Sequence, residues 1–133
     1  MATIFEKLNL KDQREILVLH SPASFEPELA ELKGITIHRR LGTVSESQFS
    51  LAFVTRKAEV DLLAAQIAQR AQGDAVVWFA YPKGTSKKYK CDFNRDNGWD
   101  KLLTQGFETV RAVAIDEDWS ALRFRRKEYV KAR

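Results

Sequence analysis

The chain has few of the residues that build disulfides or metal sites. It contains one cysteine, Cys91, and two histidines, His20 and His38, among 133 residues. A single cysteine excludes a disulfide within the chain and is typical of a reducing compartment. The histidines and the cysteine show no metal-ligand spacing. We therefore expect no metal site and no cofactor.

Long apolar runs are also missing. The longest covers residues 75–81, far short of the roughly 20 residues that a membrane span needs. The first ten residues contain Glu6 and Lys7 and no apolar stretch long enough for a signal peptide. We expect a cytoplasmic protein without membrane contact. The composition, 44% hydrophobic and 30% charged, predicts one folded domain over residues 1–133.

Positive charge is concentrated at the C-terminus. The net charge is +4, and residues 123–133 alone contain six cations and one acid, so the rest of the chain is near neutral. The basic tail, about residues 125–133, fits either a solvated end or an end that binds nucleic acid or another polyanion. The candidate polyanion-binding residues are Lys87, Lys88, Arg125, Arg126 and Lys127.

Strand-like and helix-like segments alternate along the chain. Short apolar or alternating runs predict strands at 15–20, 35–38, 49–54, 75–80, 110–115 and 119–125. Helices are expected at 3–10, 25–33, 57–72 and 96–105. This order predicts an α/β, three-layer, Rossmann-like domain with a mostly parallel sheet of five or six strands. The acidic turn at 116–118 predicts that the last two strands form a C-terminal antiparallel hairpin.

Two motifs in the second half of the chain resemble a known family. Tyr81-Pro82-Lys83-Gly84 is followed by an Asp-x-x-Trp-Ser-x-Leu-Arg-Phe motif that covers residues 116–124. Together they are similar to a family of small bacterial proteins catalogued as a domain of unknown function. The resemblance implies no particular activity.

The order of the later elements is similar to the back half of a class I methyltransferase fold. That resemblance implies a glycine-rich turn after the first strand and an acid after the second, which hold the S-adenosylmethionine (SAM) cofactor. Here residues 20–25 contain no glycine, and His38-Arg39-Arg40 stands where the acid would be. The resemblance thus implies a truncated methyltransferase fold without the cofactor-binding turn.

Candidate ligand-binding residues gather after the first, third and fourth strands. In an open parallel sheet, ligands bind beyond the carboxyl ends of the strands. His20 is either a general base or a hydrogen-bonded structural histidine. Lysines beside glycine and hydroxyl residues suit an anion, although they do not form a P-loop, and a solvated loop is the alternative. The predicted site comprises His20, Ser21, Thr55, Arg56, Tyr81, Lys83, Gly84, Thr85 and Ser86.

Three functions remain open at this point. The first is a small-anion-binding domain without catalysis, which we favour because no catalytic set is visible. The second is a nucleic-acid or polyanion interaction module, and the third is a degenerate methyltransferase-like enzyme. Cys91 follows several lysines, which lower a thiol pKa, but a loop cysteine is more often inert. The sequence indicates neither the ligand nor the oligomeric state.

Overall fold

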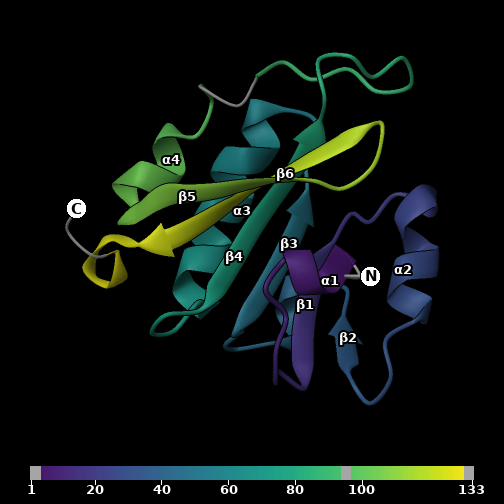
Figure 1. The fold of residues 1–133 in the computed structure, drawn as a ribbon. Helices are drawn as coiled ribbons and strands as arrows, with labels where there is room; N and C mark the ends of the chain where they lie inside the picture. The colour runs from purple at the N-terminus through teal and green to yellow at the C-terminus, as the bar shows by residue number, and fades with distance from the viewer. Residues whose placement is uncertain (1–3, 94–96, 131–133) are drawn as a thin grey trace.

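A computed structural model describes residues 4–93 and 97–130 and contains one six-stranded sheet with the order β2-β1-β3-β4-β6-β5 (Figure 1). β1, β2, β3 and β4 run parallel, whereas β6 runs antiparallel to both β4 and β5. The strands are β1 (Glu15–Leu19), β2 (Thr36–His38), β3 (Phe49–Phe53), β4 (Val76–Pro82), β5 (Phe107–Ala114) and β6 (Trp119–Arg126). The predicted fold class and the C-terminal hairpin are confirmed.

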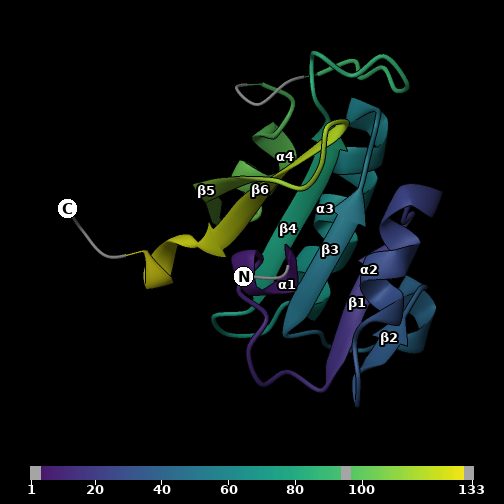
Figure 2. The ribbon, with the colours of Figure 1, turned by 45° about the vertical axis from the view of Figure 1, so that its right-hand side comes forward.

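Helices cover both faces of the sheet (Figures 1 and 2). One face carries α1 (Ile4–Lys7) and α2 (Glu26–Ala30), and the other carries α3 (Lys57–Arg70) and α4 (Asp100–Thr104). Short 3-10 turns stand at Ala23–Phe25, Leu41–Thr43 and Lys127–Tyr129. Within residues 4–93 and 97–130, no helix has the length and apolar character to span a membrane.

The central strands are buried on both faces, as expected of parallel strands between two helical layers. Every residue of β3 and β4 is buried. On one side Trp78 donates its indole N–H to the carbonyl of Leu8 at 2.7 Å, which ties α1 to the sheet. On the other side Leu63 and Ile67 of α3 belong to the hydrophobic core between this helix and the sheet. The sheet is therefore a rigid platform for the loops at its ends.

Several element bounds differ from the sequence-based expectation; the helix expected at 3–10, for example, is the single turn Ile4–Lys7. The helix expected at 25–33 is shorter, because a 3-10 turn precedes α2 and α2 ends at Ala30. The helix expected from residue 96 begins at Asp100, and residues 94–96 lie outside the described part. β5 starts at Phe107, three residues early, because Gly106 reverses the chain at a φ of +91° and Phe107 can then enter the core.

Candidate functional site

The carboxyl end of β1 leads into a turn with an unusual backbone. His20 directly follows β1 and has a φ of +58°, a left-handed conformation that glycine adopts freely and other residues rarely adopt. Its Nδ1 atom lies 3.6 Å from a carboxylate oxygen of Glu59 at the start of α3. The exposed imidazole therefore faces an acid of its own chain.

The N-terminus of α3 is already occupied by carboxylates. One oxygen of Glu59 accepts the backbone N–H groups of Thr55 at 2.8 Å and Arg56 at 3.2 Å. The side chain of Asp92 accepts the backbone N–H of Lys57 at 2.7 Å. These contacts satisfy donors that a helix leaves free in its first turn and place negative charge there. An external anion would have to displace Glu59 or Asp92.

A pocket opens at the carboxyl end of β4, beside the start of β6. Its volume is about 840 Å³. It combines two lysines, three aromatic rings and several hydroxyl groups, and none of the described residues that line it is a carboxylate. The lining residues are Tyr81, Pro82, Lys83, Gly84, Thr85, Ser86, Tyr89, Lys90, Cys91, Phe93 and Ser120. The structure thus brings together five of the nine predicted site residues, whereas His20, Ser21, Thr55 and Arg56 lie outside this lining.

The loop that forms this pocket is held by the turn between β5 and β6. The backbone N–H of Lys83 donates to the carbonyl of Asp118 at 2.8 Å, and the Ser86 hydroxyl donates to the Asp118 carboxylate at 2.8 Å. Tyr89 packs on Trp119 with ring centroids 4.9 Å apart. In the turn itself, Asp116 accepts the N–H groups of residues 118 and 119. This confirms the interpretation of the acidic run as turn chemistry.

Cys91 lines the pocket as a half-buried thiol. Burial raises its pKa, and the nearby carboxylates of Asp92 and Glu59 raise it further. The lysine-rich sequence had suggested the opposite direction. Because only the thiolate is a strong nucleophile, this environment opposes catalysis by Cys91.

The candidate polyanion-binding residues do not form one surface. Lys87 and Lys88 are exposed on the β4 loop. Arg125 forms two hydrogen bonds to Asp74, and Arg126 donates to the carbonyls of Ala68 and Ala71 at the end of α3. Both arginines belong to β6 rather than to a free tail, because β6 extends to Arg126 in pairing with Phe107. Lys127 is exposed, and residues 131–133 lie outside the described part.

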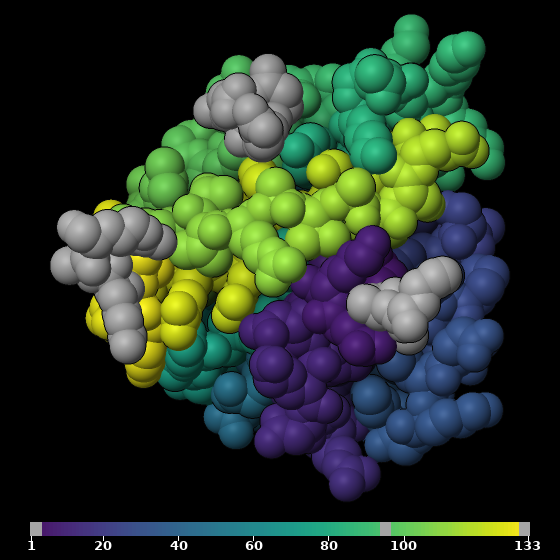
Figure 3. Space-filling view, viewed as in Figure 1, coloured from purple at the N-terminus to yellow at the C-terminus, as the bar shows by residue number. Residues whose placement is uncertain are grey.

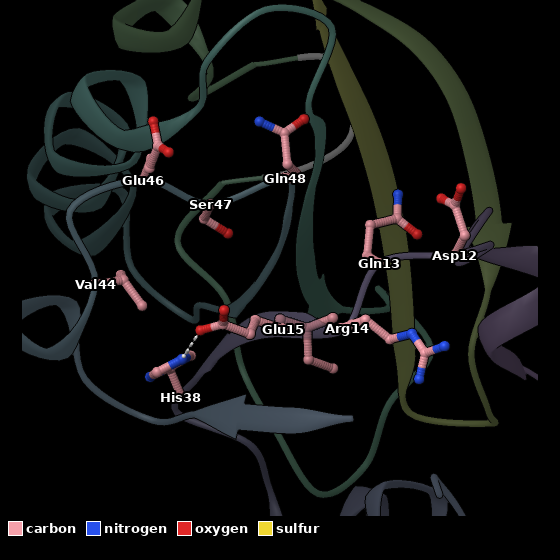
Figure 4. Close-up of a pocket in the computed structure, with 10 residues that line it drawn as sticks. Asp12, Gln13, Arg14, Glu15, His38, Val44, Glu46, Ser47 and Gln48 are labelled. Carbon is pink, nitrogen blue, oxygen red and sulfur yellow. Dashed lines mark hydrogen bonds and ion pairs between the residues drawn. The ribbon is translucent and has the colours of Figure 1, made fainter. Parts of the chain in front are cut away.

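A second pocket, of about 450 Å³, lies at the opposite edge of the sheet, before β1 and β3 (Figure 4). Three acids line it, Asp12, Glu15 and Glu46, together with His38, whose Nε2 lies 2.8 Å from Glu15. Sequence reasoning missed this pocket because it considered only the carboxyl ends of strands. The pocket has no signal in the sequence, since its residues come from three separate segments.

Comparison with known proteins supports the fold and no closer relationship. No family model matches the chain, and no curated protein matches its sequence. The resemblance to a small bacterial family therefore stays a prediction.

Several solved structures share the architecture. A SAM-dependent methyltransferase from Aquifex aeolicus matches with a TM-score of 0.65 and 10% identity over 92% of this chain and 87% of that one. One from Archaeoglobus fulgidus matches with a TM-score of 0.59 and 10% identity over 92% and 93%. The Methanococcus jannaschii fibrillarin, a pre-rRNA processing protein, matches with a TM-score of 0.56 and 12% identity over 88% and 68%. The chain has a class I methyltransferase-like fold.

The residues at the β1 and β2 ends do not fit the SAM cofactor that this fold implies. The turn after β1 contains no glycine, and Pro22 within it has no N–H to donate. Arg39 and Arg40 follow β2 in place of an acid that would accept ribose hydroxyls. Arg39 also forms a two-pronged ion pair with Glu26 of α2, at 2.7 and 3.0 Å. Any binding at this edge must therefore use other chemistry.

Proposed function

We propose that this chain is a degenerate methyltransferase-like domain that binds a small anionic ligand in the β4 pocket and does not use SAM. The observation that carries this proposal is the difference between two parts of the edge at which the parallel strands end. Its β1–β2 part is closed by ion pairs within the chain, whereas its β4 part is an open, cationic pocket.

The backbone of His20 supports descent from a glycine turn. A left-handed φ costs a residue with a Cβ atom about 1–2 kcal/mol, so such conformations are uncommon outside glycine. In dinucleotide-binding folds the same position, directly after the first strand, begins the glycine-rich turn. A chain that kept this backbone path while exchanging the glycine would retain the fold and lose the cofactor.

The chemistry of the β4 pocket supports an anion as ligand. Lys83 and Lys90 contribute positive charge, and neither forms an ion pair within the described residues. Hydroxyl groups of Thr85 and Ser120 offer hydrogen bonds beside them. The rings of Tyr81, Tyr89 and Phe93 add apolar surface. Pockets that combine apolar walls with a few convergent polar groups are typical of small-molecule sites.

Calorimetric titration with SAM and S-adenosylhomocysteine tests the loss of the cofactor. We expect no saturable binding at millimolar concentrations of either compound. Micromolar binding of either one would contradict the proposal. A His20→Gly variant should fold as well as the wild type and should still fail to bind, because the missing acid after β2 is not restored.

A thermal-shift screen with inorganic phosphate, citrate and nucleoside monophosphates tests the anion site, because a ligand that binds the native state raises its melting temperature. The affinity for the most stabilising probe is then measured for Lys83→Ala and for Lys87→Ala. Lys87 is the matched control, since it is exposed on the same loop and does not line the pocket. We expect Lys83→Ala to weaken binding about ten-fold and Lys87→Ala to leave it nearly unchanged. Equal effects of the two variants would contradict the proposed pocket.

A further inference from the structure

One face of the C-terminal hairpin carries three arginines, Arg111, Arg123 and Arg125. Near the β5–β6 turn this face is buried against the α1 side of the molecule, whereas further along β5 Arg111 is exposed. Along β6, Leu122 and Phe124 point into the core beneath α3 and α4, while Ala121 belongs to the opposite core. Because side chains alternate along a strand, Arg123 and Arg125 lie on the same face as Ala121. In Figures 1 and 3, α1 lies in front of the parallel strands, and β5 lies at the surface beside it.

Arg123 is the unusual member of this group. It is half-buried, and its Nε atom is shielded from solvent without a hydrogen-bond partner. Across residues 4–93 and 97–130, no side chain forms an ion pair or hydrogen bond with it. Burial lowers the pKa of its guanidinium, the charges of Arg125 and Arg111 lower it further, and Asp74 partly opposes them. A buried N–H donor without an acceptor is costly and rare in native proteins.

A β-bulge places a second arginine against it. Residues 107–109 pair with 126–124, but the register shifts by one residue between Thr109 and Arg111. If β5 kept its first register, Val110 would oppose Arg123 and Arg111 would lie on the other face. The shift instead pairs Arg111 directly with Arg123. Bulges commonly redirect a side chain in this way, often beside functional sites.

Arg125 is neutralised by acidic neighbours, whereas Arg111 and Arg123 are not. Arg125 is bound by Asp74, and Glu108 stands opposite it in the strand pairing. Arg111 and Arg123 have no such acid opposite them, and Trp78 flanks Arg123 on its other side. Side chains directly opposite in antiparallel strands have Cβ atoms about 4.5–5.5 Å apart, so two like charges there destabilise the sheet. An anion between them would remove this cost.

We propose that Arg111 and Arg123 form a binding site for a phosphoryl group on the arginine-bearing face of the hairpin. Guanidinium groups match phosphate oxygens in charge and geometry, and two of them on adjacent strands can hold one phosphate from two sides. The group belongs either to a small phosphorylated molecule or to a nucleic-acid backbone. The site is separate from the β4 pocket and does not depend on the function proposed for it.

Nuclear magnetic resonance of the full chain tests this site directly, because the Nε–Hε signals of individual arginines are resolved. The probes are inorganic phosphate and a ten-nucleotide single-stranded oligo-dT. We expect saturable shifts of the Arg123 and Arg111 signals with phosphate. In Arg123→Gln, the shift of Arg111 should require about ten-fold more phosphate. Arg40→Gln is the matched control, since it removes an exposed arginine after β2, at the other edge of the sheet.

The two probes also separate the sources of the phosphoryl group. Shifts with phosphate but not with the oligonucleotide assign the site to a small phosphorylated ligand. Oligonucleotide binding that phosphate competes for assigns it to a nucleic-acid backbone. The Arg111 and Arg123 shifts should persist in Lys83→Ala, which distinguishes this site from the β4 pocket. Absence of saturable shifts with both probes, or equal weakening in Arg40→Gln, would overturn the proposal.

Discussion

The two halves of the carboxyl edge of the sheet differ in whether their charged side chains are paired within the chain. At the β1–β3 half, His20 faces Glu59, Arg39 binds Glu26, and Asp92 caps α3. At the β4 half, the pocket is lined by Lys83 and Lys90, and no carboxylate stands among its described lining residues. The hairpin repeats this contrast, because Arg125 is bound by Asp74, whereas the Nε atom of Arg123 has no hydrogen-bond partner within residues 4–93 and 97–130. Charges paired within the chain stabilise it, and unpaired charges remain available to a ligand.

The residues predicted from topology to form one site therefore do not line one pocket in the structure. Parallel strands bring all of their carboxyl ends to one edge, and that rule holds here. Which loop can accept a ligand depends on where the chain places its own acids. Glu59 and Asp92 occupy the helix terminus that otherwise would attract an anion. The pocket therefore lies one strand further along.

The largest expected effect comes from removing the support beneath the β1–β3 half. Leu63 of α3 is 5% exposed and packs in the core, while its neighbour Leu62 is 64% exposed. Leu63→Ala should lower the free energy of unfolding by about 2–5 kcal/mol, the usual cost of a core truncation. Leu62→Ala should change it by less than about 0.5 kcal/mol. Chemical denaturation measures both, and similar values for the two variants would mean that the buried face of α3 is wrong.

A second prediction concerns the contacts that Glu59 makes at the start of α3. Glu59→Ala removes the acceptor of two backbone N–H groups at the start of α3 and the partner of His20. We expect a loss of about 0.5–2 kcal/mol of stability, as for other helix caps. Glu117→Ala, which removes an exposed acid in the hairpin turn, is the control and should have little effect. The first variant should also gain affinity for inorganic phosphate, because the N–H groups of Thr55 and Arg56 lose their acceptor. Unchanged phosphate affinity would argue against the role assigned to Glu59.

A third prediction concerns the unpaired charge on the hairpin. Arg123→Gln removes one of two opposed positive charges and should raise stability by about 0.2–1 kcal/mol at low salt. Because salt screens this repulsion, the gain should shrink at high ionic strength. Thermal unfolding at two salt concentrations measures it. A loss of stability in this variant at both concentrations would show that the guanidinium is held by contacts that offset the repulsion.

The smallest expected effect depends on pH. The hydrogen bonds from Arg125 hold the pKa of Asp74 below its usual range. A carboxyl group with a lowered pKa stabilises the fold above its pKa in the unfolded chain, and this contribution is lost as the pH falls through the folded-state value. Asp74→Asn should therefore reduce the acid dependence of stability below about pH 4 while costing about 0.2–1 kcal/mol near neutrality. Arg125→Gln should cause the same reduction, since either variant removes the pair; different pH profiles would contradict this account.

The sequence predicted most of the fold because local patterns carry the relevant physics. Apolar runs indicated the buried strands, and the 3.6-residue spacing of Val60, Leu63 and Ile67 indicated the face of α3 that packs on the sheet. The acidic turn at 116–118 indicated the hairpin. The start of β5 was predicted wrongly, because it depends on tertiary pairing with β6.

The sites depended on contacts between distant segments. The sequence placed lysines and hydroxyl residues after β4, which determines the chemistry of that loop, and it excluded a glycine turn after β1. It could not show that Asp92 reaches α3, that Asp118 holds Ser86, or that a one-residue shift sets Arg111 against Arg123. Local composition determines which groups a segment can offer. Only the packing of strands from separate parts of the chain decides which of those groups are neutralised and which remain free.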